Sequence, residues 1–216
     1  MKRGFFVSFE GIDQSGKTTQ LFLLKKRLEE KGISVLYVRE PGGTKIGEQI
    51  REILLDKGNL GMSRETELLL FEAARAQIVR EVILPAMRGN KIVFCDRFFD
   101  ATIAYQAFAR GLDRAHIDFL NHFATDGLEP DLTFLLDLSP ETAMQRRKGN
   151  DIDEDRLEVE GLDFMGKVRD GYLHLAADCK RITVFDATAS TEELAQKIAH
   201  RFWEVVNETD ICNSPR

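Results

Sequence analysis

Short apolar runs alternate along this sequence with longer segments in which apolar residues recur every three or four positions. Each run is apolar on both alternating faces, which is typical of strands buried between two layers of helices. The predicted strands are Phe5–Phe9, Ser34–Val38, Lys91–Cys95, Leu132–Asp137 and Ile182–Phe185. The segments with helical spacing are residues 17–31, 45–56, 64–88, 113–125, 140–148, 161–178 and 191–207.

Strand and helix thus take turns along the chain, which predicts a parallel sheet with right-handed crossovers in a three-layer α/β sandwich. We expect one domain, residues 1–216, because no repeat, low-complexity tract or Pro/Gly/Ser-rich linker marks a boundary. Two helix starts also stand out. Ser139 precedes Pro140 as an N-cap, and Ser190 with Glu193 has the spacing of a capping box.

Composition and net charge exclude several classes of protein and of binding partner. The chain is 43% hydrophobic and 31% charged with only 5 Pro, so fibrous and disordered classes are excluded. Its 30 Lys+Arg against 36 Asp+Glu give a net charge of -6. Broad charge attraction to DNA, RNA or anionic lipid is not expected, so we predict neither a nucleic-acid polymer nor a membrane as partner. An anionic ligand must meet a local basic site instead.

The cysteines and the lengths of the apolar runs indicate the cellular compartment of the protein. Cys95, Cys179 and Cys212 are odd in number and far apart, so neither a disulfide framework nor a cysteine metal site is indicated. The N-terminal apolar run ends at Glu10, too early for a signal peptide, and no run approaches the ~18 apolar residues of a membrane helix. We expect reduced thiols in a cytoplasmic protein.

A phosphate-binding pattern, G-x-x-x-x-G-K-T, lies directly after the first predicted strand and opens the first predicted helix. In that context its glycines let backbone N–H groups and a helix N-terminus face a phosphate chain. Lys17 can then reach the outer phosphates, and the Thr18 hydroxyl can ligate Mg²⁺. The alternative is a chance glycine-rich turn. The pattern consists of Gly11, Ile12, Asp13, Gln14, Ser15, Gly16, Lys17 and Thr18.

Charged residues follow two other predicted strands, where ligands of open α/β sheets gather. Asp96 ends an apolar strand as in a Walker B segment, and Arg97 comes next. Arg39 leads into Glu40-Pro41-Gly42-Gly43, a sharp turn that can hold a guanidinium toward a phosphate. The alternative for Arg39 is a plain loop with a solvated side chain.

Two helical segments carry further candidates. Phe71 and Arg75 are four residues apart and can face one side, although an aromatic residue on an apolar helix is usually core. Residues 100–110 follow the Asp96-Arg97 pair, and taken by themselves they are predicted to form a surface helix. They include Thr102, Tyr105 and Gln106.

The most charged segment begins at Arg146 and breaks the predicted helical pattern. It is either a solvated loop or a short lid, about residues 146–157, that brings guanidinium groups to a transferring phosphoryl and excludes water. Its cations are Arg146, Arg147, Lys148 and Arg156, and its acidic residues lie at 151 and 153–155.

Together these residues resemble the thymidylate kinase family, P-loop nucleoside-monophosphate kinases that phosphorylate dTMP. The P-loop alone indicates a superfamily, whereas the R-E-P-G-G turn and the D-R pair in this order indicate the family. The resemblance covers almost the whole chain. It rests on residues 9–11, 39–43, 71–75, 96–97, 104–106, 130–132, 136–137, 155–158 and 186–188.

The resemblance implies a P-loop NTPase fold with a five-stranded parallel sheet and a short lid. It also implies ATP with Mg²⁺ as phosphoryl donor, dTMP as acceptor, a place in dTTP synthesis, and a homodimer. ATP would contact the P-loop residues, Thr19, Asp186 and Ala187, with Thr18 and Asp96 serving the metal, the latter through water.

For the acceptor, the resemblance implies that Asp13 approaches the sugar 3′-hydroxyl and that Arg39 and Arg97 bind the phosphate. Tyr105 would crowd the 2′ position and favour deoxyribose. The base pocket follows the same family pattern: Phe71 stacks on thymine, Arg75 and Gln106 bind its edge, and Thr102 lies beside them.

One departure concerns catalysis. Some family members carry an Arg in the P-loop where this chain has Gln14, and in those that lack it the lid supplies the catalytic guanidinium. The expected reaction is direct in-line transfer, without a general base. Its catalytic residues would be Lys17, Arg97 and one of Arg146, Arg147 or Arg156, with Lys148 a lesser candidate.

Other P-loop classes fit less well. A GTPase needs N-K-x-D, but Asn90-Lys91 is followed by Ile92-Val93, and the L-S-G-G-Q signature of transport ATPases is missing. The nearest alternative is a kinase for another nucleotide or a cofactor precursor, which would differ in the Phe71, Arg75 and Gln106 pocket. A non-enzymatic nucleotide-binding module comes last, since it has no use for two arginine-bearing strand ends.

Overall fold

The computed structural model describes residues 4–150 and 156–208. Within these ranges, five strands form one sheet in the order β2-β3-β1-β4-β5, and every neighbouring pair is parallel. The predicted strands are confirmed, each within one residue at either end. They are β1 (Phe5–Glu10), β2 (Val35–Arg39), β3 (Ile92–Asp96), β4 (Leu132–Asp137) and β5 (Ile182–Asp186).

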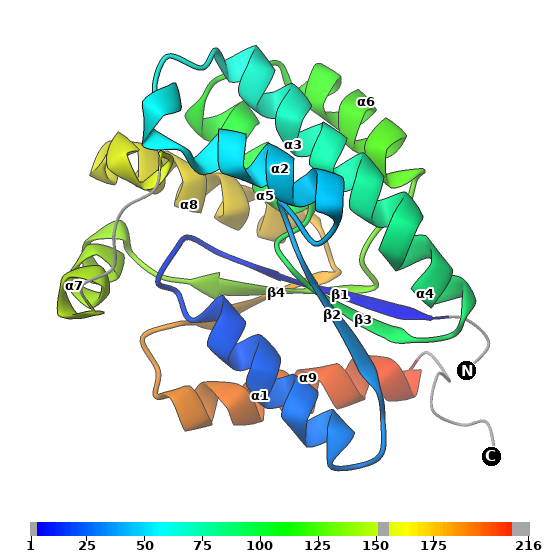
Figure 1. Cartoon of the computed structure of the whole chain (residues 1–216). Helices are drawn as coiled ribbons and strands as arrows, with labels where there is room; N and C mark the ends of the chain where they lie inside the picture. Colours follow the sequence, from blue (N-terminus) through cyan, green and yellow to red (C-terminus); the bar gives the residue numbers. More distant parts are fainter. Residues whose placement is uncertain (1–3, 151–155, 209–216) are drawn as a thin grey trace.

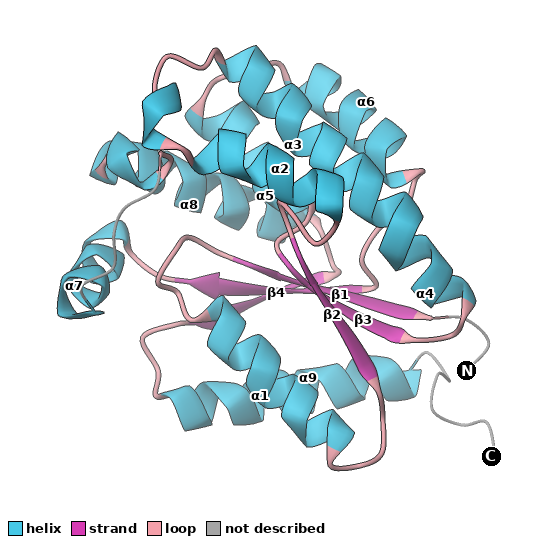
Figure 2. Ribbon diagram, viewed as in Figure 1, coloured by secondary structure: helices cyan, strands magenta, loops and turns pink. Residues whose placement is uncertain are grey.

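Helices cover both faces of the sheet, which confirms the three-layer α/β prediction. In Figure 1, α1 and α9 lie below the sheet, whereas α2, α3, α6 and α8 lie above it, and Figure 2 shows the same layers by element type. The helices are α1 (Lys17–Glu29), α2 (Lys45–Leu55), α3 (Arg64–Ile78), α4 (Leu84–Arg88), α5 (Phe99–Thr102), α6 (Arg114–Thr125), α7 (Pro140–Asn150), α8 (Leu162–Asp178) and α9 (Thr191–Glu208).

Within the described residues, four further helical segments connect or extend these helices. Two are π-helical: η2 (Val79–Ile83) joins α3 to α4, and η3 (Ile103–Ala109) continues α5. Two are 3₁₀ turns, η1 (Lys57–Asn59) and η4 (Glu158–Glu160). Within residues 4–150 and 156–208, we find no helix with the length and apolar character needed to cross a bilayer.

The sheet core is built from aromatic contacts across its central strands. Phe9 packs on Phe94 and Phe134 with ring centroids 5.5 and 5.2 Å apart. Phe202 of α9 meets Phe5 and Phe94 edge-on, at 5.9 Å in each case. Burying one such side chain stabilises the fold by about 1.5–3 kcal/mol, so β1, β3 and β4 are held firmly side by side.

The same pairing brings the carboxyl ends of three strands together. Asp96 of β3 lies opposite Phe9 of β1 on one side and opposite Arg39 of β2 on the other. Residues that follow these strands therefore meet at one edge of the sheet, where α/β proteins bind their ligands.

Three expectations about the elements are wrong. Edge strand β5 is not buried on both faces, because it has a neighbour on one side only, and Val184 is 43% exposed. The charged segment does not break the helical pattern at Arg146, since α7 continues through Arg146 to Asn150, two residues beyond the predicted end of this helix. The stretch after Arg97 is helical but buried rather than on the surface, because η3 packs against α8.

Both N-caps are confirmed, whereas the Glu193 side chain of the predicted capping box pairs with Lys197 at 2.7 Å. The Ser139 hydroxyl accepts the Thr142 N–H at 3.2 Å, and the Ser190 hydroxyl accepts the Glu193 N–H at 3.3 Å. Of the predicted features, residues 151–155 of the lid and Cys212 lie outside the described residues.

Candidate active site

The loop between β1 and α1 forms a cradle of backbone N–H groups. Gly11 and Gly16 have φ angles of 134° and 89°, in the left-handed region that other residues avoid. A Cβ on Gly11 would come within 2.4 Å of the Leu136 carbonyl oxygen, so the loop has no space for a side chain there. Gly16 also offers no side chain to the first N–H groups of α1, which leaves them for an anionic ligand.

Lys17 and Asp13 give this cradle its charge. The Lys17 side chain is 6% exposed, and its Nζ donates to the Ile12 carbonyl at 2.9 Å and lies 3.7 Å from Asp13 Oδ1. Burial, and then the charge of Arg97, lowers the pKa of Lys17. Burial alone would raise the pKa of Asp13, but Arg97 and Lys17 together hold it well below its usual value. Asp13 is therefore ionised at neutral pH.

Arg97 follows β3 with a φ of 69°, an uncommon conformation for a residue with a side chain. Its backbone N–H donates to the Phe9 carbonyl at 3.0 Å, which fixes this bend to β1. The guanidinium then reaches Asp13 Oδ1 at 2.6 Å and the Gly11 carbonyl at 2.9 Å. The predicted meeting of the P-loop and the third strand end is therefore present.

Thr18 and Asp96 also meet at this edge. The Thr18 hydroxyl donates to Asp96 Oδ2 at 2.5 Å. A hydroxyl and a carboxylate are hard oxygen donors that suit Mg²⁺, which usually takes one or two protein ligands and completes its shell with phosphates and water. These residues fit such an ion, and we see no cluster of three or more His, Cys, Asp or Glu side chains suited to a metal across the described ranges.

Two cavities open at the carboxyl edge of the sheet. The larger, of about 1600 Å³, lies in front of the P-loop. Its walls come from α1, the ends of β2 and β3, and α7. The predicted residues that line it are Asp13, Gln14, Gly16, Lys17, Thr18, Thr19, Arg39, Asp96, Arg97 and Arg146.

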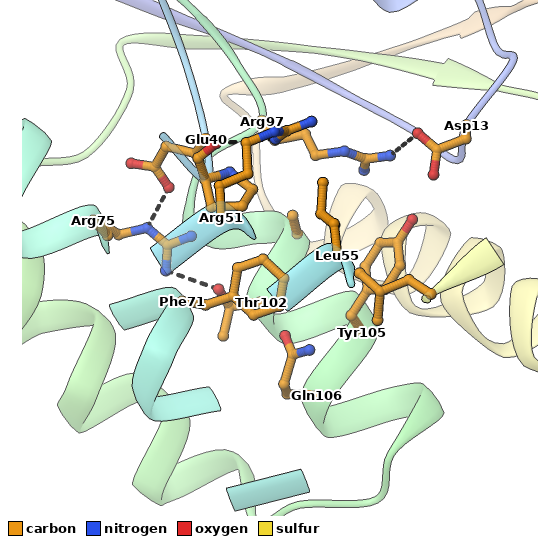
Figure 3. A pocket seen from close by; sticks show the side chains of 13 residues that line it. Asp13, Glu40, Arg51, Leu55, Phe71, Arg75, Arg97, Thr102, Tyr105 and Gln106 are labelled. Carbon is orange, nitrogen blue, oxygen red and sulfur yellow. Dashed lines mark hydrogen bonds and ion pairs between the residues drawn. The ribbon is translucent and has the colours of Figure 1, made fainter. Parts of the chain in front are cut away.

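The smaller cavity, of about 580 Å³, lies between α2, α3 and η3 (Figure 3). Figure 3 shows the Phe71 ring on one side, with Thr102, Tyr105 and Gln106 below and beside it. This mixture of one flat aromatic face and a few polar groups is typical of a small-molecule pocket. The predicted residues that line it are Asp13, Phe71, Arg75, Arg97, Thr102, Tyr105 and Gln106.

The two cavities adjoin, because Asp13, Glu40, Arg51 and Arg97 line both of them. Arg97 carries its positive charge at this junction, with its guanidinium 5.4 Å from the Tyr105 ring centroid. Two ligands placed in the two cavities would thus meet beside one guanidinium.

Arg75 is fixed within a buried polar network. Its side chain is 2% exposed, and its Nε donates to Glu40 Oε2 at 2.8 Å. Its Nη1 lies within 3.0 Å of acceptors on Glu72, Thr102 and Asn121. Burial raises the pKa of Glu40 to about 7, although Arg75 opposes this shift. The network presents Arg75 to the cavity as a rigid group.

Arg39 reaches one cavity only. Its Nη2 pairs with Glu48 Oε2 at 2.7 Å, its Nη1 donates to the Pro41 carbonyl, and it lines the larger cavity. The side chain is 37% exposed, so this pair contributes little to stability. Arg39 therefore lies on the P-loop side and not on the Phe71 side, and its binding of a phosphate stays a prediction.

The three candidate lid arginines lie in different places. Arg146 donates to the Gln14 carbonyl at 3.1 Å and to the Ala187 carbonyl at 2.7 Å, so it bridges the P-loop and the turn after β5. Arg147 lies on the other side of Asp13, in a small cavity with Ile12. Arg156 is 2% exposed and pairs with Glu67 at 2.7 Å, away from the P-loop.

Four of the remaining predicted ATP contacts do not line the larger cavity: Ile12, Ser15, Asp186 and Ala187. Ala187 is 2% exposed and comes near the P-loop through Arg146, whereas Asp186 turns back to accept from the Thr188 hydroxyl at 2.6 Å. Ile12 and Ser15 do not line the larger cavity, and they shape the loop with their backbone.

Sequence reasoning missed several wall residues. Arg51 and Leu55 both face the cavities from α2, one helical turn apart, but a 3.6-residue stripe cannot be distinguished from an ordinary core face. Pro41 and Leu157 complete the walls of the smaller cavity. Glu40 lay within a noted turn, yet its pairing with Arg75 joins residues 35 positions apart and left no local signal.

A P-loop on a parallel sheet, opening on two adjoining cavities with an arginine at their junction, defines a P-loop nucleotide-binding phosphotransferase. Comparison with known sequences gives the family. The family model for thymidylate kinase matches residues 9–198, and the chain belongs to the thymidylate kinase family.

Two curated relatives illustrate how far the similarity extends. A thymidylate kinase from Kosmotoga olearia is 48% identical over 198 residues, covering 91% of this chain and 94% of the relative. A thymidylate kinase from Geotalea uraniireducens is 50% identical over 196 residues, covering 88% and 92% respectively.

Proposed function

We propose that this protein transfers the γ-phosphoryl group of ATP to dTMP, giving dTDP and ADP, as a step in dTTP synthesis. Membership of the thymidylate kinase family supports the reaction. The observation that carries it here is the pair of adjoining cavities that share Asp13 and Arg97. One cavity has a P-loop and the other an aromatic face with polar groups at its edge.

The smaller cavity takes dTMP in this proposal. Its thymine stacks on Phe71, and Arg75 and Gln106 read its edge, with Thr102 beside them. Stacking accepts any flat base, whereas buried edge groups penalise a base that leaves them unpaired. The rigid pairing of Arg75 with Glu40 supports such discrimination, because Arg75 cannot readily move to suit another base.

The sugar and phosphate then lie toward the cavity junction. Tyr105 crowds the 2′ position and Asp13 approaches the 3′-hydroxyl, which an ionised carboxylate can accept from. Arg97 binds the dTMP phosphate at the junction, and Arg39 approaches it from the larger cavity.

The larger cavity takes ATP, with its phosphates over the P-loop and Lys17. The adenine end extends toward Ala187, Asp186 and Thr191. Thr18 and Asp96 would hold Mg²⁺, Asp96 through water. When bound, the ion neutralises phosphate charge and orients the phosphate chain.

Transfer follows an in-line displacement. A dTMP phosphate oxygen is already an anionic nucleophile, so its bond to the γ-phosphorus forms while the bond to the ADP oxygen breaks, and no side chain takes a proton. Lys17 and Arg97 stabilise the charge from either side. Arg146 is the strongest lid candidate, because it alone of the three lid arginines lines the P-loop cavity.

We also propose a homodimer in the cytoplasm. The α6 residues Phe119 and Phe123 support the dimer, because they are 69% and 68% exposed and one helical turn apart. Two such aromatic side chains make an apolar stripe that a second copy can cover.

A coupled ADP-release assay with a panel of nucleoside monophosphates tests the function. We expect turnover with dTMP, and we expect AMP and CMP to give rates near background.

Lys17→Ala should abolish turnover while dTMP still binds, since the lysine lies outside the smaller cavity. Phe71→Ala should raise the dTMP KM about tenfold or more through lost stacking. Activity on AMP or CMP without dTMP would overturn the proposal.

A further inference from the structure

Glu67 is a buried carboxylate on α3, one helical turn before Phe71, with 1% of its surface exposed. Its Oε1 accepts from Gln106 Nε2 at 2.9 Å and from Arg110 Nε at 3.1 Å. Its Oε2 accepts from Arg110 Nη2 at 3.0 Å and pairs with Arg156 Nη1 at 2.7 Å. Each carboxylate oxygen is thus met by two N–H donors.

These donors keep Glu67 ionised. Burial alone would raise the pKa of Glu67, but Arg110, followed by Gln106 and Arg156, holds it below its usual value. An ionised carboxylate can only accept hydrogen bonds, so the partner atom of Gln106 has to be the amide nitrogen. The opposite orientation would set the Gln106 carbonyl oxygen against a negative charge.

The amide oxygen of Gln106 consequently faces the cavity. Figure 3 shows this oxygen directed toward the Phe71 ring. Gln106 is 1% exposed and lines the smaller cavity, so the oxygen is available there to a ligand in van der Waals contact with Phe71.

We infer that Glu67 is a positioning residue for base recognition: it fixes the Gln106 amide so that the oxygen accepts a hydrogen bond from a pyrimidine N3–H. This inference rests on the proposed function. Thymine and uracil carry that hydrogen, whereas the N3 of cytosine is an acceptor and would face the Gln106 oxygen with no hydrogen between them. Glu67 thereby sets the hydrogen-bond polarity of the pocket without touching the base.

The surroundings of Glu67 explain why the amide stays fixed. Arg110, just beyond η3, also pairs with Glu160 at 2.6 Å and lies 4.5 Å from the Phe164 ring centroid. Arg156 also donates from Nε to the Leu54 carbonyl at 2.6 Å. Both guanidinium groups are therefore held by further elements, so the carboxylate between them cannot rotate freely.

The test uses Glu67→Gln, which keeps the shape but gives the side chain an amide that can both donate and accept. Gln106 can then turn its nitrogen to the cavity. We expect the KM for dTMP and for dUMP to rise about tenfold, as for loss of one buried hydrogen bond, with kcat and the ATP KM nearly unchanged. In a Gln106→Ala background the same substitution should change the dTMP KM less than about twofold.

Glu160→Gln is the matched control, because it weakens a contact of Arg110 in the same network but leaves all four N–H donors of Glu67 in place. It should leave the dTMP KM near the wild-type value, so a rise confined to the Glu67 variant is not a general effect of weakening this network. If Glu67→Gln does not fold, Glu67→Asp is the second test, because its shortened carboxylate withdraws from Gln106 and leaves the amide free to turn. The dTMP KM should then rise with Gln106 present and stay nearly unchanged in the Gln106→Ala background.

The inference would be overturned if Glu67→Gln changed the dTMP KM equally in the wild-type and Gln106→Ala backgrounds. An unchanged dTMP KM in a folded Glu67→Gln protein would also overturn it. Failure of the proposed function is distinguishable, because wild-type protein would then show no dTMP turnover before any variant is made.

Discussion

At the scale of single residues, the site depends on a few side chains whose conformation or charge departs from the ordinary. Arg97 adopts a left-handed backbone, which costs about 1–3 kcal/mol in a residue with a side chain. Its bond to the Phe9 carbonyl and its pairing with Asp13 offset that cost. The bend directs the guanidinium to the cavity junction rather than along the strand.

Glu10 is the second unusual residue. It is fully buried at the end of β1, where it accepts from the Phe98 N–H at 2.7 Å and the Tyr172 hydroxyl at 2.9 Å. Burial and the nearby Asp100 carboxylate raise the pKa of Glu10 from its usual 4.5 to about 8, although Arg97 opposes the shift. At neutral pH the folded protein therefore holds a proton on Glu10.

This proton makes stability depend on pH. Between the unfolded pKa of 4.5 and the folded pKa of about 8, the folded state binds more protons than the unfolded state, so stability falls as pH rises. Glu10→Gln removes that dependence. Urea unfolding should show the variant gaining on wild type by about 1 kcal/mol or more between about pH 5.5 and about pH 8.5. Parallel pH profiles would contradict the raised pKa.

At the scale of elements, the residues proposed to bind the base depend on how η3 packs against α8. The π-helical η3 places Tyr105 and Gln106 in the wall of the smaller cavity, and π-helical segments are frequent at functional sites. Gly171 of α8 lets Phe108 of η3 approach closely, since a Cβ at Gly171 would lie 2.8 Å from the Phe108 ring. The position of η3 is thus set by a small residue on another helix.

Two glycines of α8 give a matched test of this packing. Gly171→Ala should push η3 away, lower the melting temperature by several degrees and raise the dTMP KM. Gly166→Ala is the control, because a Cβ there meets nothing within 4 Å. It should stabilise the protein by about 0.5–1 kcal/mol, as expected for Gly to Ala inside a helix, without changing KM. Equal behaviour of the two variants in thermal unfolding and kinetics would argue against the packing role.

At the scale of the whole molecule, charge is distributed unevenly. The chain has a net charge of -6, yet the two cavities gather Lys17, Arg39, Arg51, Arg97 and Arg146. An enzyme that binds two highly charged nucleotides needs this local excess, whereas its acidic exterior limits nonspecific binding to polymers.

The proposed homodimer also belongs to this scale. Replacing Phe119 and Phe123 with Glu should yield a monomer by sedimentation velocity, because a second copy can no longer bury the stripe on α6. Phe22→Ser is the control, since Phe22 is a 45% exposed aromatic residue on α1, in the opposite helical layer. A monomeric wild type would contradict the dimer, and an unchanged mass in the double variant would exclude this face as its interface.

Much of this protein could be predicted from local sequence. The strands, most helices and the P-loop were predictable because burial on both faces, helical periodicity and a glycine-lysine pattern are properties of neighbouring residues. The resemblance to the family likewise followed from contiguous motifs such as residues 39–43 and 96–97. The exposure of β5 was not predictable, since it depends on which strand ends at the sheet edge.

Tertiary structure alone decided the partnerships between distant residues. Arg75 pairs with Glu40, and Arg156, a candidate lid residue by sequence, is instead held by Glu67. Gln106 owes its orientation to the same carboxylate, 39 positions away. Sequence determined which chemical groups this chain possesses and the local elements that carry them. Folding determined which of those groups meet, because buried charges and amides take their orientation from partners that local sequence does not specify.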